Sequence, residues 1–254
     1  MLARQRQELI LDEVRSTGGV RVSDLVERLG VSDMTVRRDI EALAGRGLVT
    51  RVHGGATNAS SSVDEPGFAA KATLRIEAKR AVANAAATLI EPGASVALSA
   101  GTTTHLVAGA LLAVPRLTVV TNSLPVASVL HEAGRADLSV ILTGGERTPS
   151  DALAGPVAVS TISGLHVDWL LMGVHGMDAT AGFTTPNLAE AETNRALMRS
   201  ARRTAVVADS SKWGMVGLIT IAALEDVDVV VTDDGLEPEA REAVESHCSR
   251  LVIA

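Results

Sequence analysis

Residues 31–43 read VSDMTVRRDIEAL, and this stretch decides the fold of the amino-terminal part of the chain. Ser32 is a suitable N-cap, since its hydroxyl can accept a hydrogen bond from a free amide of the first helical turn. Val36, Ile40 and Leu43 recur at i, i+4 and i+7, so they would lie along one stripe of a helix. The other face would carry Met34, Arg37, Arg38 and Glu41. The stretch predicts a short capped helix that packs on one face and is exposed on the other.

A second short helical pattern, at residues 20–29, precedes this helix, and only Gly30 and Val31 separate the two. Two helices joined so tightly favour a helix-turn-helix, whose second helix enters the DNA major groove with its N-terminus first. Hydroxyl and guanidinium groups of that helix would contact base edges or phosphates. The residues predicted to do so are Ser32, Thr35, Arg37 and Arg38. A small solvated helix in a larger bundle fits the same pattern, so the helices alone leave the function open.

Residues 48–56, LVTRVHGGA, follow the second helix and predict a hairpin with a glycine-rich end. Such a hairpin would be the wing of a winged helix-turn-helix. Arg51 and His53 would flank the DNA backbone there, and Gly54 would let the main chain come close to it. For His53 alone, a solvated loop histidine is the simpler interpretation. The hairpin makes DNA binding the favoured interpretation of the whole segment.

The first 56 residues resemble the N-terminal winged helix-turn-helix domain of DeoR-type bacterial transcriptional regulators. The resemblance rests on VSDL at residues 22–25, SDMTVRRD at 32–39 and RVHGGA at 51–56. Proteins of that family are mostly repressors of sugar or polyol catabolic operons that release DNA when a phosphorylated sugar binds the C-terminal domain. The resemblance therefore implies double-stranded operator DNA and a phosphorylated sugar or polyol as partners. We expect a homodimer or homotetramer, since a dimer would present two DNA-binding domains.

The 254 residues allow one further domain beyond a winged helix. Apolar residues make up 46% and aromatic residues only 2%, so the core must consist of Ala, Val, Leu and Ile, which favours an α/β protein. The net charge of -7 is unevenly distributed: residues 1–57 hold nine Arg and eight acidic residues, a net of +1. The acidic excess therefore lies outside the predicted DNA-binding domain, and two such domains in an oligomer would offset repulsion from it.

Three predictions concern the organisation of the whole chain. Residues 58–67, NASSSVDEPG, are small and polar, so we predict a linker at 58–71 between a DNA-binding domain at 1–57 and an α/β domain at 72–254. Cys248 is the one cysteine, which excludes a disulfide framework and a cysteine-rich metal site. No basic-apolar leader and no run of about 18 apolar residues is present, so the expected location is the cytoplasm, with no membrane association.

The second domain alternates strand and helix patterns. Strands are predicted at 95–98, 117–120, 139–142, 169–172, 204–208, 227–231 and 251–253, and helices at 72–90, 103–112, 125–132, 156–163 and 188–201. Near-continuous apolar strands separated by helices indicate a mostly parallel sheet that is covered on both faces. The fold class is therefore α/β.

Ligands of open α/β sheets bind at the carboxyl ends of strands, where loops carry free amides onto helix N-termini. Five polar, Gly-bearing or charged loops follow predicted strands, at 99–104, 121–123, 143–146, 173–178 and 209–214. The residues predicted from these loops to bind an anionic effector are Gly101, Thr102, Thr103, Thr104, Asn122, Gly144, Gly176, Asp209 and Lys212. Each loop alone could equally be a turn or a cap.

The second domain is similar to the C-terminal domain of the same DeoR family, which has the fold of ribose-5-phosphate isomerase and CoA transferases. The matching landmarks include GTT at 101–103, TNS at 121–123, EAE at 190–192 and ADSSK at 208–212, and they add Glu190 to the predicted effector-binding residues. The chain departs from the family pattern at Ser99, where Asp is usual, and at Asn194, where Lys is usual. The missing carboxylate puts the identity of the sugar in doubt more than phosphate recognition.

Two other functions fit parts of the sequence. An isomerase or CoA-transferase-like enzyme would need positioned acids and bases. The available carboxylates form no recognisable set, so we predict no catalytic residues and no enzyme. An interaction module without a small ligand is the third possibility. The six histidines are too scattered to predict a metal site, and no cofactor is expected.

Overall fold

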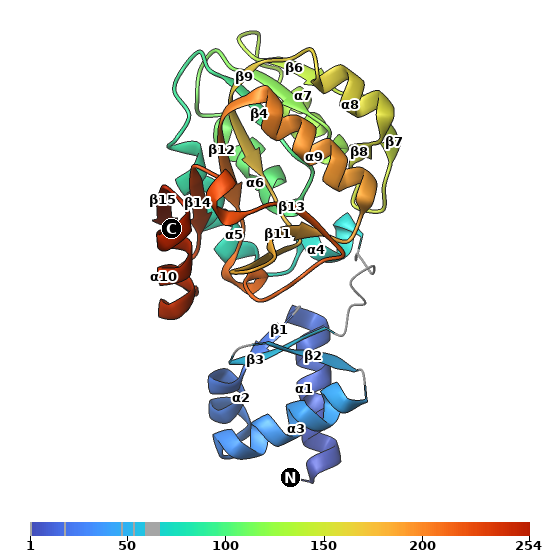
Figure 1. Ribbon diagram of the computed structural model, residues 1–254, viewed down its shortest axis with the longest axis vertical. Coiled ribbons are helices and arrows are strands. Elements are labelled where there is room, and N and C mark those ends of the chain that lie inside the picture. The colour runs from blue at the N-terminus through green and yellow to red at the C-terminus, as the bar shows by residue number, and fades with distance from the viewer. Residues whose placement is uncertain (1, 18, 47, 53, 59–66) are drawn as a thin grey trace. The chain divides into compact units, whose positions relative to one another are not determined.

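The computed structural model describes residues 2–17, 19–46, 48–52, 54–58 and 67–254. By its internal contacts the chain divides into two units, Met1–Asp64 and Glu65–Ala254 (Figure 1). No helix in the described ranges is long and apolar enough to cross a membrane.

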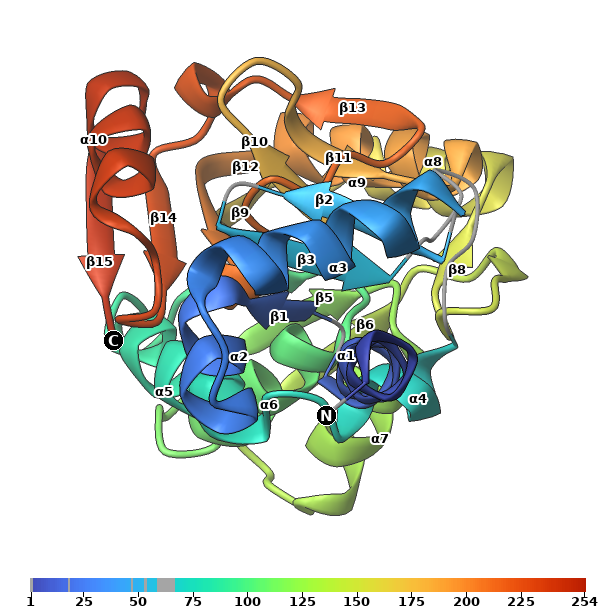
Figure 2. The same ribbon diagram turned by 90° about the horizontal axis from the view of Figure 1, so that it is seen from below.

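The N-terminal unit consists of three helices and a small antiparallel sheet. Its elements are α1 (Ala3–Thr17), β1 (Gly19–Arg21), α2 (Val22–Leu29), α3 (Asp33–Gly45), β2 (Val49–Val52) and β3 (Gly55–Asn58). The strands pair in the order β1-β3-β2. Figure 2 shows α2 leading into α3 through a short turn. The predicted helix-turn-helix and the hairpin that follows it are confirmed.

The core of this unit is the stripe predicted from the sequence. Val36, Ile40 and Leu43 are at most 2% exposed, and they pack with Ile10 and Val14 of α1. The turn between α2 and α3 depends on Gly30, whose φ of 64° lies in the left-handed region that glycine adopts without strain.

One boundary in this unit differs from the prediction. Val20 and Arg21 were expected at the start of a helix, but they belong to β1 and pair with β3. The strands approach so closely that a Cβ on Gly55 would lie 2.0 Å from the carbonyl oxygen of Val20. Sheet pairing therefore overrides the helical pattern of these two residues.

The C-terminal unit is built on a seven-stranded sheet in which every pair of neighbours is parallel. Its strands are β4 (Ser95–Leu98), β5 (Thr118–Thr121), β6 (Ser139–Leu142), β9 (Val167–Met172), β12 (Ala201–Val207), β14 (Val229–Thr232) and β15 (Arg250–Ile253). They lie in the order β15-β14-β12-β9-β4-β5-β6. The predicted parallel α/β fold is confirmed.

Helices cover both faces of this sheet. One face packs against α5 (Ile76–Ala87), α6 (Thr102–Leu111) and α7 (Leu124–Glu132). The other packs against α8 (Pro156–Ile162), α9 (Leu188–Ser200) and α10 (Pro238–His247). Successive residues of a central strand, such as Val206 and Val207, are both fully buried but belong to opposite cores. This explains why the strands are continuously apolar instead of alternating.

Several short elements were not predicted. An antiparallel sheet joins β10 (Gly176–Asp178), β11 (Gly182–Thr185) and β13 (Ile219–Ala222), and β7 (Glu146–Arg147) pairs with β8 (Leu153–Ala154). Two 3-10 turns, η1 (Ser210–Lys212) and η2 (Leu224–Asp226), follow β12 and β13. These segments are too short for a periodicity to be visible.

The segment before the sheet also differs from the prediction. Residues 58–71 were expected to form a linker, but Phe68–Ala72 is a helix, α4. The helix predicted at 72–90 begins only at Ile76, because Arg75 has a φ of 50° and interrupts the helical backbone. The prediction was wrong here because Ala-rich sequence supports a helix on either side of the break.

Candidate functional site

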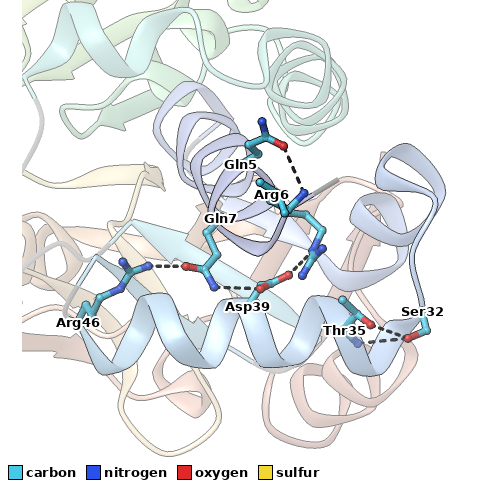
Figure 3. A network of polar contacts seen from close by, with 8 residues as sticks. Gln5, Arg6, Gln7, Ser32, Thr35, Asp39 and Arg46 are labelled. Carbon is cyan, nitrogen blue, oxygen red and sulfur yellow. Dashed lines mark hydrogen bonds and ion pairs between the residues drawn. The ribbon is translucent and has the colours of Figure 1, made fainter.

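The first turn of α3 is held by its own polar side chains. Ser32 caps the helix, with its Oγ accepting from the amide of Thr35 at 3.4 Å. The hydroxyls of Ser32 and Thr35 also pair with each other, with 2.9 Å between the oxygens (Figure 3). Both residues were predicted to contact DNA, and both lie at the end of the helix that a helix-turn-helix inserts first.

The three residues of the Arg37-Arg38-Asp39 motif have different surroundings. Arg37 forms an ion pair with Asp33 one turn earlier, with 2.6 Å between Nε and Oδ1. This pair is exposed, and hydrogen bonding to the Asp33 carboxylate raises the pKa of Arg37. Arg38 is exposed, and no described residue forms a hydrogen bond or ion pair with it. Arg38 is therefore the arginine of this helix whose donors are available to DNA.

Asp39 holds the helix in place instead of facing solvent. It is 4% exposed and accepts a hydrogen bond from Nε of Arg6 at 2.5 Å and from Nε2 of Gln7 at 3.0 Å. Gln7 in turn accepts from Arg46 at the end of α3 (Figure 3). This network fixes the exposed face of α3 relative to α1.

The wing residues have structural partners as well. Arg51 lies on β2 and pairs with Glu41 of α3 at 2.9 Å, and both side chains are exposed. Gly54 has a φ of 77°, and its carbonyl accepts from the amide of Val22, so the turn itself explains the glycine. His53 lies outside the described residues.

The C-terminal unit contains a pocket at the carboxyl ends of its central strands. The strand order changes direction between β4 and β9, because the chain runs from β4 outward to β6 and then from β9 outward to β15. Ligands of open α/β sheets bind at such a switch point. The pocket has a volume of about 50 Å³. It is lined by Lys71, Ala100, Gly101, Thr102, Thr103, Ser150, Gly173, Val174, His175, Thr185, Glu190, Asn194, Ala208, Lys212 and Ile221.

Half of the predicted effector-binding residues line this pocket, namely Gly101, Thr102, Thr103, Glu190 and Lys212. The other half do not line it, namely Thr104, Asn122, Gly144, Gly176 and Asp209. The strand order explains why Asn122 and Gly144 do not line the pocket. Loops after β4, β9 and β12 meet because these strands are neighbours, whereas β5 and β6 lie about 5 and 10 Å farther out.

The residues outside the pocket support its walls. Asn122 accepts from the amide of Ala100 and donates to the carbonyl of Leu153, so it ties the loop after β5 to the pocket loop. Thr104 donates to the carbonyl of Gly101. Asp209 caps η1 by accepting from the amide of Ser211. For these three residues the structure gives a positioning role.

The backbone explains why two of the glycines predicted to bind the effector are glycines. A Cβ on Gly176 would lie 2.0 Å from the carbonyl oxygen of Met215, so β10 and the loop after η1 require a glycine there. Gly144 has a φ of 72°, which places it in a left-handed turn after β6.

All the lysines of this chain lie at or beside the pocket. The 23 basic residues comprise three lysines and 20 arginines. Lys71 and Lys212 line the pocket, and Lys79 donates from Nζ to the carbonyl of Lys71 at 2.7 Å. Sequence reasoning missed Lys71 because it considered strand ends, and Lys71 lies on α4 before the first strand. The concentration of all lysines in two short segments was the signal that could have found it.

Burial and positive charge determine the protonation of the groups around the pocket. Burial lowers the pKa of Lys79 to about 8; Asp209 opposes this shift, whereas Lys212, Lys71 and Arg75 add to it. Burial also lowers the pKa of His175 to about 3, with further lowering by Lys212 and Lys71. His175 is therefore a neutral imidazole at neutral pH, and the two lysines that lower its pKa are the ones that line the pocket.

Among the described residues, the carboxylate that lines the pocket is that of Glu190, and it is already oriented. Oε1 of Glu190 accepts hydrogen bonds from the hydroxyls of Thr148 and Ser150. Ser150 lines the pocket and was not predicted. The arrangement suits an anion held by lysines and amides, beside a carboxylate and hydroxyls that can bind the hydroxyl groups of the same ligand.

The two units match two parts of one protein family. Residues 6–62 match the DeoR-like helix-turn-helix domain, and residues 74–234 match the DeoR C terminal sensor domain. The chain is 37% identical to the HTH-type transcriptional regulator GlpR of Haloferax volcanii over 97% of this chain and 96% of that protein. It is 36% identical to the glycerol-3-phosphate regulon repressor of Escherichia coli over 92% of each.

Solved structures that are similar to the chain are more distant. Ribose 5-phosphate isomerase A from Neisseria gonorrhoeae aligns with a TM-score of 0.40 and 15% identity, over 55% of this chain and 54% of that one. A likeness at this level carries no information about chemistry. The helix-turn-helix at one end and the sensor domain at the other place the chain in the DeoR family of DNA-binding transcriptional regulators.

Proposed function

We propose that this chain represses a sugar or polyol catabolic operon, and that a phosphorylated sugar or polyol bound in the switch-point pocket releases it from operator DNA. The observation that carries the proposal is the meeting of Lys71 and Lys212 at one pocket with Thr102 and Thr103 of the α6 N-terminus. A relative of comparable length is named as a repressor of the glycerol-3-phosphate regulon, which is consistent with a phosphorylated polyol.

The pocket chemistry suits a phosphate group. The N-terminus of α6 directs amides and partial positive charge at the ligand, and the lysine ammonium groups add full charges. A volume of about 50 Å³ has room for roughly three to five water-sized groups, which is the scale of a phosphate. The rest of the ligand would extend along Glu190 and Asn194 at the pocket wall.

We further propose that α4 transmits the ligand's presence. Lys71 lines the pocket and lies on α4, the first helix of the C-terminal unit along the chain. Two contacts dock this helix: the Lys79 bond to the Lys71 carbonyl, and an edge-on contact of Phe68 with His105 of α6, with ring centroids 5.5 Å apart. A phosphate that draws Lys71 inward would therefore act on the segment that leads to the DNA-binding unit.

The test measures ligand binding and DNA release separately. Thermal shift and a mobility-shift titration would compare glycerol 3-phosphate and a panel of sugar phosphates with the unphosphorylated compounds, on a duplex selected by the chain from a random pool. Lys212→Met should weaken the response to the active phosphate at least about tenfold and leave DNA binding without ligand unchanged. The control is Arg202→Met, since Arg202 lies on the amino half of β12 and is 83% exposed. Equal release of Lys212→Met and parent would refute the site.

Phe68→Ala tests the transmission step alone, because Phe68 does not line the pocket. This variant should bind the phosphate as the parent does but need more of it to leave DNA. Unchanged release at unchanged binding would contradict the role of α4.

Three further properties belong to the proposed function. The chain binds its ligand without converting it, since Glu190 is already engaged by two hydroxyls; NMR of the ligand after incubation would reveal an isomer if this is wrong.

It acts as a homodimer or homotetramer, because paired helix-turn-helix units match paired half-sites. It works in the cytoplasm, where a bacterial operator is found. Light scattering of the full chain measures the oligomeric state directly.

A further inference from the structure

Met34 is the large apolar residue that is exposed on the described DNA-binding helix. It lies in the first turn of α3, and 66% of it is exposed, although the buried stripe of the same helix is at most 2% exposed at Val36, Ile40 and Leu43. A long flexible thioether in this position contributes nothing to the core of the unit. Its exposure points to a contact outside the N-terminal unit.

The polar neighbours of Met34 are engaged with each other. The hydroxyls of Ser32 and Thr35 pair at 2.9 Å, and Asp33 holds Arg37 one turn later. Among the described residues of the first two turns, the exposed side chains without such a partner are Met34 and Arg38. They are separated by four residues, so they lie on the same side of the helix.

The base edges of the major groove offer one apolar group, the C5 methyl of thymine. The helix of a helix-turn-helix enters that groove with its first turn leading. We infer that Met34 is a specificity-determining residue of this regulator, and that it packs against the methyl group of one thymine in each half-site. The inference depends on DNA binding by the family and is independent of the effector.

The spacing of Met34 and Arg38 along the helix predicts how far apart the bases lie that the two side chains contact. Four residues of helix rise about 6 Å, and base pairs are stacked at about 3.4 Å, so the two side chains reach bases within about two pairs of each other. Arginine most often binds guanine through O6 and N7. Each half-site should therefore contain a thymine within about two base pairs of a guanine.

The experiment uses the full chain and a duplex that the parent protein selects from a random pool. Each thymine of the selected half-site is replaced in turn by deoxyuridine, which removes the C5 methyl and nothing else. Dissociation constants are measured for the parent, for Met34→Ala and for Leu9→Ala. Leu9→Ala is the matched control, since Leu9 is 43% exposed on α1 and equally apolar.

The parent and Leu9→Ala should lose affinity at one thymine position, by about three- to fivefold for each half-site, which is the scale of burying one methyl group. Met34→Ala should bind the unmodified duplex correspondingly less tightly and show no further loss on replacement at that position. Met34→Leu, which keeps an apolar side chain, should retain the sensitivity to deoxyuridine.

Three results would overturn the inference. In the first, deoxyuridine has the same effect on Met34→Ala as on the parent at every position, which means that Met34 does not recognise the methyl group. In the second, no thymine position shows an effect. In the third, the selection enriches no sequence. In each of these cases Met34 does not determine specificity through a thymine methyl.

Discussion

Removing the Asp39 carboxylate should destabilise the N-terminal unit selectively. Asp39 and Arg6 form an ion pair whose side chains are 5% and 11% exposed, with 2.5 Å between Nε and Oδ2. Asp39→Ala leaves the guanidinium of Arg6 buried beside α3 without that carboxylate. Breaking a buried pair by removing one partner typically costs about 3–5 kcal/mol of stability. At about 1.4 kcal/mol for each factor of ten, the population of the unfolded unit should rise by about 10²-fold to several thousandfold.

The assay must observe this unit alone. The chain has two tryptophans, Trp169 and Trp213, and no tyrosine, so fluorescence reports on the C-terminal unit. Native-state hydrogen exchange on peptides from α1 and α3 is therefore the appropriate measurement. The matched control is Asp33→Asn, which breaks an exposed pair on the same helix and should change protection little.

A double variant tests whether the buried Arg6 charge, once it has lost the Asp39 carboxylate, causes the loss of stability. Arg6→Met combined with Asp39→Leu replaces the pair with apolar side chains, and such replacements are often neutral or stabilising. The double variant should therefore recover most of the protection that Asp39→Leu alone removes. If Asp39→Ala exchanges like Asp33→Asn, the buried pair does not stabilise the unit. If the double variant is as unstable as Asp39→Leu, the buried Arg6 guanidinium is not the cause.

Three other changes have defined outcomes. Arg38→Ala should weaken operator binding more than Arg37→Ala, because the Arg37 guanidinium is already paired with Asp33; equal effects of the two variants in a mobility shift would refute the distinction. The folded pKa of Lys79, about 8, lies below its ordinary 10.5, so the unfolded chain holds this proton more tightly. Stability of the C-terminal unit should therefore rise from pH 8 to 10.5. Urea unfolding followed by tryptophan fluorescence should show this rise in the parent and not in Lys79→Met. Gly55→Ala should expose β1 to hydrogen exchange more than Gly54→Ala, because its Cβ meets a backbone oxygen at 2.0 Å whereas Gly54 faces open space; the reverse order would contradict it.

Periodicity predicted most of the longer elements of this chain, although not α10, because it depends only on local burial. Val36, Ile40 and Leu43 face the core as their spacing requires. The seven parallel strands were found for the same reason, since strands buried on both faces are continuously apolar. The sequence pattern also identified Ser32 as a cap, because capping is a local hydrogen bond.

The candidate pocket was harder to predict because strand order is a property of the whole sheet. Polar loops after all five strands looked equivalent in the sequence, yet those after β4, β9 and β12 reach the pocket and those after β5 and β6 do not. Lys71 was missed for a related reason, since α4 reaches the pocket from outside the alternating pattern. Contacts between residues that are far apart in the sequence produce no periodic pattern in it.

The departure from the family pattern at position 99 has a physical consequence for the ligand. Ser99 is fully buried, and its Oγ accepts from the amide of Gly173 at 2.9 Å, so it joins the loops after β4 and β9 at the switch point. A carboxylate in this place would put a negative charge beside a pocket that Lys71 and Lys212 line. Serine performs the positioning without opposing an anion. If the proposed phosphorylated ligand binds here, the lysines would therefore hold its phosphate end, and Asn194 together with the oriented carboxylate of Glu190 would select among sugars.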